Sequence, residues 1–182
     1  MVNAKMAAFG LTHVYYGNGK GKTTAALGLA LRASGCDKRV VVVQFLKDMK
    51  CGELVSLALL PGVTVFRGKS CGKLFVRDMD EAEIEMIRQT HDSNLKTALA
   101  LQASGECDLL VLDELMDALE LGLVDENAVS GLIKNKPPEL ELVITGHKPI
   151  AWMLDAADYV TEMKKIKHPY DRGITGRRGI EF

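Results

Sequence analysis

Residues 15–24, which read YYGNGKGKTT, decide the fold class of this chain. A glycine-rich turn that leads into a helix presents backbone N–H groups and the positive end of the helix to an anion. The usual phosphate-binding loop has a glycine, four residues and then Gly-Lys-Ser/Thr. Here three residues separate Gly17 from Gly21, and Tyr16 stands in place of the first glycine. We interpret the stretch as a shortened phosphate-binding loop, and the alternative is a glycine-rich turn with solvated lysines.

Apolar runs of strand length alternate with longer helical patterns on the C-terminal side of this loop. That alternation is typical of a parallel sheet with helices on both faces. The runs VVVVQF and LLVL lack a polar alternation, which places them in the centre of the sheet. We expect strands at residues 11–16, 39–45, 63–66, 109–112, 140–145 and 158–161, and helices at 22–34, 80–103, 126–134 and 149–157.

The length and composition predict one domain over residues 1–182. A net charge of −1 gives no general attraction to nucleic acid or to anionic lipid, and no apolar run is long enough to span a membrane. The four cysteines form no Cys-x-x-Cys pair, and the start of the chain does not resemble a secretory signal. We therefore expect a cytoplasmic protein that binds neither nucleic acid nor membrane.

Two stretches without a clear pattern are candidates to cover a ligand. One runs from residue 49 to 79 and is glycine-punctuated, and the other is a C-terminal tail at 166–182. Lys47 and Glu53 flank a possible loop over the ligand, and the alternative for them is a solvated ion pair.

A second motif, LLVLDEL at residues 109–115, completes the expected site. It puts Asp113 and Glu114 at the carboxyl end of an apolar strand, where parallel α/β sheets bind ligands. With the hydroxyl group of Thr23 these carboxylates can hold Mg²⁺, while Lys22 reaches the terminal phosphates. The two motifs predict a nucleoside triphosphate site on a doubly wound, mostly parallel α/β fold of the P-loop NTPase-like, RecA type.

The chemistry done with the triphosphate is not decided by these two motifs. Glu114 follows the metal-binding aspartate, where it can orient a water for hydrolysis. A hydrolytic ATPase, acting as a motor, switch or loading factor, is therefore one interpretation.

Longer segments of the chain carry a more specific signal. GNGKGKTT, VVVVQFLK, LLVLDEL, VITG and the closing KHPYDRGITGRRGIEF occur in this order. Together they resemble the P-loop type of ATP:corrinoid adenosyltransferase, in which the shortened loop is the normal form. The resemblance implies transfer of the 5'-deoxyadenosyl group of ATP to the Co(I) of a reduced corrinoid, with release of tripolyphosphate. It also implies a homodimer that receives electrons from a flavoprotein or another low-potential reductant.

The resemblance also implies roles for individual residues. Lys20 and Lys22 would stabilise charge on the leaving triphosphate, and Thr23, Asp113 and Glu114 would hold Mg²⁺ or Mn²⁺. ATP would be held by Gly17, Asn18, Gly19, Lys20, Gly21, Lys22, Thr23 and Thr24, with Arg32 on the first helix as a further contact.

Two positions depart from the family pattern on the corrinoid side. Better-known members carry Phe-x-Trp after the third strand, where this chain has Phe75 as its only aromatic residue. Many members have arginine where this chain has His147. We expect Phe75 and His147 to contact the corrinoid, and Phe75 packing under its own loop is the alternative. These departures leave a non-catalytic module that binds ATP or corrinoid as a further interpretation.

Overall fold

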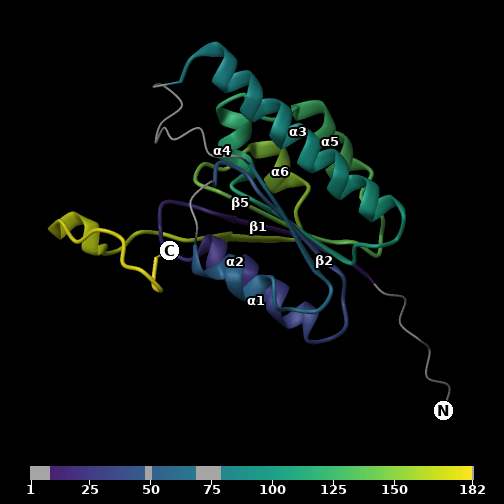
Figure 1. Ribbon diagram of the computed structural model, residues 1–182, viewed down its shortest axis with the longest axis horizontal. Helices are drawn as coiled ribbons and strands as arrows, with labels where there is room; N and C mark the ends of the chain where they lie inside the picture. Colours follow the sequence, from purple (N-terminus) through teal and green to yellow (C-terminus); the bar gives the residue numbers. More distant parts are fainter. Residues whose placement is uncertain (1–8, 48–50, 69–78, 182) are drawn as a thin grey trace.

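The core of the protein is a six-stranded sheet in which every neighbouring pair of strands is parallel (Figure 1). The computed structural model describes residues 9–47, 51–68 and 79–181, and the strands listed here belong to those residues. The order across the sheet is β3-β2-β4-β5-β1-β6. The strands are β1 (Thr12–Tyr16), β2 (Val40–Gln44), β3 (Val63–Arg67), β4 (Leu109–Asp113), β5 (Glu141–Gly146) and β6 (Tyr159–Glu162).

Helices cover both faces of this sheet (Figure 1). The described helices are α1 (Lys22–Ser34), α2 (Gly52–Leu57), α3 (Glu81–Ala103), α4 (Leu115–Glu120), α5 (Glu126–Lys134) and α6 (Ala151–Asp155). α1 and α2 lie on one side of the sheet, and α3 to α6 lie on the other. The predicted doubly wound α/β architecture is therefore confirmed. Within the described residues, no helix combines the length and apolarity needed to cross a membrane.

Two separate clusters of buried side chains fill the space between the sheet and its helices. On one face, Ala26 and Ala30 of α1 pack on Val40 and Val42 of β2. Val41 belongs to the other cluster, which includes residues of α3, α4, α5 and α6. Successive side chains of a strand point to opposite faces, so a strand in the middle of a two-layered core must be apolar throughout. The uninterrupted valine run of β2 meets that requirement.

Three elements differ from the sequence-based expectation. α2 falls inside the stretch 49–79, which we expected to be irregular. α4 was not predicted, and it begins directly after β4. Glu114 alone turns the chain between them, with a φ of 64°. The tail contains a 3₁₀ helix at Pro169–Arg172, whose start is capped when Tyr170 N donates to His168 Nδ1 over 3.2 Å.

The start of α3 has a reciprocal capping pattern that joins Asp80 and Glu83. Glu83 N donates to Asp80 Oδ1 over 2.9 Å, and Asp80 N donates to Glu83 Oε2 over 2.8 Å. This reciprocal pair satisfies two backbone donors that the helix itself cannot satisfy.

His91 connects α3 to the end of β2 from within the core. Its side chain is buried, Nδ1 lies 2.9 Å from Leu123 O, and Leu46 N lies 3.3 Å from Nε2. The carbonyl oxygen can only accept and the amide can only donate, so these partners require a neutral ring protonated at Nδ1. Burial is the main cause that lowers the pKa of His91 below its ordinary 6.5.

We expect this histidine to make folding stability depend on pH. As the pH falls through 6.5, the unfolded chain binds a proton at this position before the folded protein does, and the free energy of unfolding decreases. His91→Gln, which keeps a donor and an acceptor but does not titrate there, is expected to show a smaller decrease between about pH 7 and pH 5. Urea titrations at several pH values measure the difference, with His168→Gln in the tail as the control. An unchanged slope in His91→Gln would contradict this role.

Candidate functional site

The loop between β1 and α1 has the backbone of a phosphate-binding turn. Gly17 and Gly21 have φ values of 115° and 116°, which side-chain-bearing residues rarely adopt. Gly21 precedes α1, and no side chain caps the first turn of that helix. The N–H groups at the start of α1 are therefore directed to the end of the sheet where the loop lies.

The glycines of this loop also allow a close approach by the segment that follows β6. A Cβ atom at Gly17 would lie 2.5 Å from Met163 O, and one at Gly19 would lie 2.6 Å from the same atom. Gly19 N donates to Met163 O over 2.6 Å, and Lys165 N donates to Asn18 Oδ1 over 2.9 Å. The loop glycines thus have a packing role, which the spacing of the motif alone did not indicate.

Lys22 is buried inside the loop. Its Nζ donates to Gly17 O over 2.8 Å and to Gly19 O over 3.0 Å. These bonds fix the ammonium group against the backbone of the loop and place a positive charge there. The predicted grouping of Lys22 with the loop glycines is present.

Asp113 at the end of β4 is the centre of a hydrogen-bond network. Its side chain is 0% exposed. Oδ1 accepts from Thr23 Oγ1 over 2.9 Å and from Thr145 Oγ1 over 2.8 Å. Oδ2 accepts from Lys47 Nζ over 2.7 Å and from Gln44 Nε2 over 3.2 Å. The structure thus joins Thr23 to Asp113 by a hydrogen bond, and these are two of the three residues that the motifs assigned to one metal site.

Three members of this network were not predicted as site residues. Lys47 contacts Thr23 and Asp113, and the alternative of an ion pair with Glu53 is absent from the described contacts. Gln44 and Thr145 lie near the ends of their strands, β2 and β5. A usable signal was present, since polar residues at the carboxyl ends of parallel strands converge on one edge of the sheet.

Glu114 joins this network through its backbone, and its carboxylate lies outside the hydrogen bonds of the network. Its backbone N donates to Thr145 Oγ1 over 2.8 Å, and the described residues donate no hydrogen bond to its carboxylate. Burial raises the pKa of the Glu114 carboxyl group, and the negative charge of Asp113 raises it further. Both effects oppose the ionised form, so the fold holds an acidic group here at a cost.

The donor set around Asp113 fits a hard divalent cation such as Mg²⁺. Carboxylate and hydroxyl oxygens are the ligands that this ion prefers. The ammonium group of Lys47 lies against Thr23 Oγ1 and Asp113 Oδ2 at 2.8 and 2.7 Å, so positive charge is accommodated between those atoms. Gln44 Oε1 is also buried and has no hydrogen-bond partner among the described residues.

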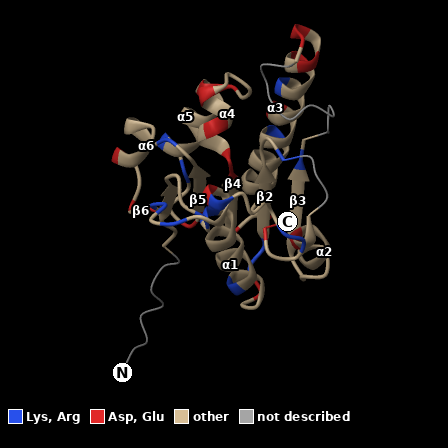
Figure 2. Cartoon of the chain, turned by 90° about the vertical axis from the view of Figure 1, so that its left-hand side faces the viewer, with Lys and Arg blue, Asp and Glu red and all other residues tan. Residues whose placement is uncertain are grey.

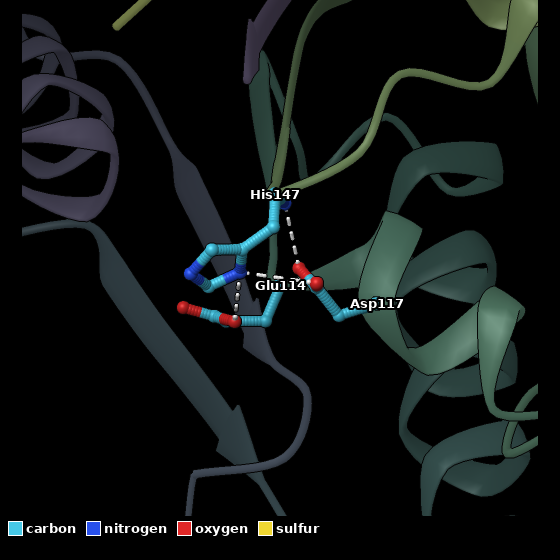
Figure 3. Close-up of side chains that lie close together, drawn as sticks. All are labelled: Glu114, Asp117 and His147. Atoms are coloured by element: carbon cyan, nitrogen blue, oxygen red, sulfur yellow. Dashed lines mark hydrogen bonds and ion pairs between the residues drawn. The ribbon is translucent and has the colours of Figure 1, made fainter. Parts of the chain in front are cut away.

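His147 forms a second group with Glu114 and Asp117 at the end of β5 (Figure 3). Its Nδ1 lies 3.0 Å from Asp117 Oδ1 and 3.9 Å from Glu114 Oε2. Its backbone N donates to Asp117 Oδ2 over 3.0 Å, and its carbonyl oxygen accepts from Gly17 N at the same distance. Asp117 was not predicted, and it fixes the ring of a half-exposed histidine at the edge of the loop.

Other predicted residues lie away from this centre. Arg32 is in the last turn of α1, about 15 Å along the helix axis from Lys22. Lys20 points to the tail, where its Nζ lies 2.8 Å from Glu181 Oε1. Phe75 lies outside the described residues.

In Figure 2, acidic and basic residues are both present around the start of α1, where the strand ends meet.

The sequence matches a family model over residues 8–182, and that model describes the ATP:corrinoid adenosyltransferase BtuR/CobO/CobP. The chain belongs to this family. It is 33% identical to a corrinoid adenosyltransferase of Pseudomonas aeruginosa, over 95% of this chain and 84% of the relative. A corrinoid adenosyltransferase of Escherichia coli (strain K12) is 31% identical, over 95% of this chain and 86% of the relative.

A solved structure supports the fold assignment independently. EssC (ATPases 2 and 3) from Geobacillus thermodenitrificans aligns with a TM-score of 0.51 and 15% identity, over 93% of this chain and 35% of the solved chain. At this identity the likeness concerns the fold alone. The predicted P-loop NTPase-like fold is confirmed.

The raised pKa of Glu114 predicts a gain in stability when its charge is removed. A carboxyl group whose pKa is raised by folding stabilises the fold below its ordinary pKa of 4.5, and that contribution is lost as the pH rises through the raised value. Glu114→Gln is therefore expected to unfold a few degrees above the wild type at pH 7 without added metal. Thermal unfolding with a chelator present measures the difference, which should shrink below pH 4.5. Glu139→Gln, in an exposed loop, is the control, and a lower melting temperature for Glu114→Gln would contradict the assignment.

Proposed function

We propose that this protein transfers the 5'-deoxyadenosyl group of ATP to the Co(I) of a reduced corrinoid and releases tripolyphosphate. The observation that carries the proposal is the hydrogen bond from Thr23 to Asp113, directly after the loop that holds Lys22, in a chain that belongs to the adenosyltransferase family. ATP and the corrinoid are then the two substrates.

The reaction forms a bond between cobalt and C5' of the ribose and breaks the bond from C5' to the triphosphate oxygen. The electron pair of Co(I) makes the new bond, and the pair of the broken bond leaves with the triphosphate. No protein nucleophile is required, because the corrinoid supplies it. The tasks left to the protein are to align the two substrates, exclude water and stabilise the charge that gathers on the leaving group.

The loop residues suit the last of these tasks. Lys22 is held among backbone groups of the loop, so its charge is already in place before the reaction. Lys20 lies at the same turn and is paired with Glu181 of the tail. We infer that Lys22 is the main cation on the triphosphate and that Lys20 joins it when the tail covers the substrate.

Mg²⁺, or Mn²⁺ in its place, would be held by Thr23 and Asp113 with Glu114 beside them. The ion neutralises phosphate charge when it is bound. Asp113 is suited to this role because Thr145 and Gln44 fix its carboxylate from two neighbouring strands.

The corrinoid is proposed to contact His147, and the C-terminal tail, residues 166–182, is proposed to cover the ligands. The ring of His147 is oriented by Asp117 and is 55% exposed, so it is available to a ligand. Phe75 remains our prediction for the lower face of the corrinoid. Arg32 as a nucleotide contact, a homodimer, a flavoprotein or other low-potential reductant and a cytoplasmic location complete the proposal.

The products of the reaction test this function. Incubation with ATP, Mg²⁺ and chemically reduced cob(I)alamin is expected to give a light-sensitive adenosylated corrinoid and tripolyphosphate in equal amounts. Chromatography of the corrinoid and of the phosphate products measures both. Orthophosphate released without a need for corrinoid would instead support a hydrolytic ATPase, and tight binding without product would support a non-catalytic module.

Removal of the loop cation tests the mechanism. Lys22→Ala is expected to lower kcat/KM by about a hundredfold or more, because a positioned charge on the leaving group is lost. Circular dichroism should show an intact fold. Lys96→Ala changes an exposed lysine of α3 and serves as the matched control. Activity of Lys22→Ala within a few-fold of the wild type would exclude the role assigned to Lys22.

A further inference from the structure

We propose that Lys47 competes with the divalent cation for the same oxygen atoms, so that its ammonium group must leave them when the metal enters with the nucleotide. The proposal rests on the function proposed above, because it uses Thr23 and Asp113 as the metal site. It assigns a role to a lysine outside the phosphate-binding loop.

The first argument is the set of lone pairs that Lys47 uses. Thr23 donates its single hydroxyl hydrogen to Asp113 Oδ1, which leaves only lone pairs on Thr23 Oγ1. Lys47 Nζ donates to this oxygen over 2.8 Å. A metal ion that binds the threonine hydroxyl group requires a lone pair of the same atom. Lys47 therefore occupies the metal-facing side of Thr23.

The second argument concerns the Asp113 carboxylate. Oδ1 already accepts two hydroxyl donors, from Thr23 and Thr145. Oδ2 accepts the Lys47 ammonium over 2.7 Å and the Gln44 amide over 3.2 Å. Thus Oδ2 is the oxygen on which a cation is bound, and Lys47 is that cation in this structure. Among the described residues, no other ammonium or guanidinium group forms an ion pair with Asp113.

The third argument is that the fold anchors the backbone next to Lys47, whereas the side chain of Lys47 is flexible. The preceding residue, Leu46, has a φ of 55° and donates its backbone N–H to His91. The Lys47 side chain is 24% exposed, and a lysine has a flexible four-carbon stem. The ammonium group can therefore move toward the substrate side while its backbone anchor stays in place.

The charge balance at Asp113 explains why the exchange of Lys47 for the metal ion should depend on the nucleotide. A buried carboxylate requires a paired cation, and Lys47 supplies it. A divalent ion beside an unmoved Lys47 would be repelled by that charge. The nucleotide removes the conflict, because its phosphates can accept the ammonium group that the metal displaces. We therefore expect the metal to bind well only together with the nucleotide.

The test is the affinity for Mn²⁺ alone, measured by electron paramagnetic resonance without nucleotide or corrinoid. Lys47→Met keeps a similar length and removes the charge, so it is expected to bind Mn²⁺ about tenfold more tightly than the wild type, or tighter still. Adding Thr23→Val to Lys47→Met should abolish the gain. Lys96→Met is the matched control and should bind Mn²⁺ as the wild type does.

A second measurement covers the case in which Lys47→Met folds poorly. Lys47→Gln can still donate a hydrogen bond to Asp113 but carries no charge, and it is expected to show the same tighter binding of Mn²⁺. Its melting temperature without metal should fall below that of the wild type and should rise more steeply with added Mn²⁺. Affinity equal to the wild type in both variants would overturn the proposal. That result would leave the transfer reaction untouched, since the titration contains neither substrate of the reaction.

Discussion

The Asp113 carboxylate is fully buried, and four side chains from other parts of the chain are arranged around it. Removing an ionised carboxylate from water costs several kcal/mol unless hydrogen bonds and a cation replace the water. The replacements come from α1, β2, β5 and the turn after β2. Because those elements must meet at one carboxylate, the packing of α1 on the sheet and the register of the central strands are coupled to the geometry of the site.

The loop shows how one sequence feature can serve two physical purposes. Positive φ values at Gly17 and Gly21 give the turn its shape, and the absence of a Cβ atom at Gly17 and Gly19 lets the Met163 backbone lie against it. Both purposes exclude larger residues, but only the first belongs to the phosphate-binding pattern. The same contact joins the loop after β1 to the segment that follows β6 and leads into the tail.

Much of the architecture was predictable, because it depends on local sequence. The helices at 22–34 and 126–134 were predicted with the bounds that the structure shows. α4 was missed because the chain turns at a single residue, Glu114, whose positive φ has no glycine to mark it. The contact of Lys47 with Asp113 was not predicted, because Asp113 is 66 residues away and is reached through the pairing of β2 with β4. Spacing along the chain reports local structure, whereas these contacts depend on strand order.

Strand order also explains how Lys47, whose ammonium group pairs with Asp113, is connected to the core. In the sheet, β2 pairs with β4, so Gln44 lies opposite Asp113, and the next residue, Phe45, donates its backbone N–H to the carbonyl oxygen of Asp113. His91 of α3 holds that turn through Leu46, one residue before Lys47. A buried neutral histidine thus holds the backbone next to Lys47, and its own hydrogen bonds among the described residues are to Leu46 and Leu123. The anchored backbone at Leu46 keeps the Lys47 ammonium group within reach of Asp113. The flexible side chain of Lys47 is what allows the proposed movement of this ammonium group from the carboxylate to a phosphate.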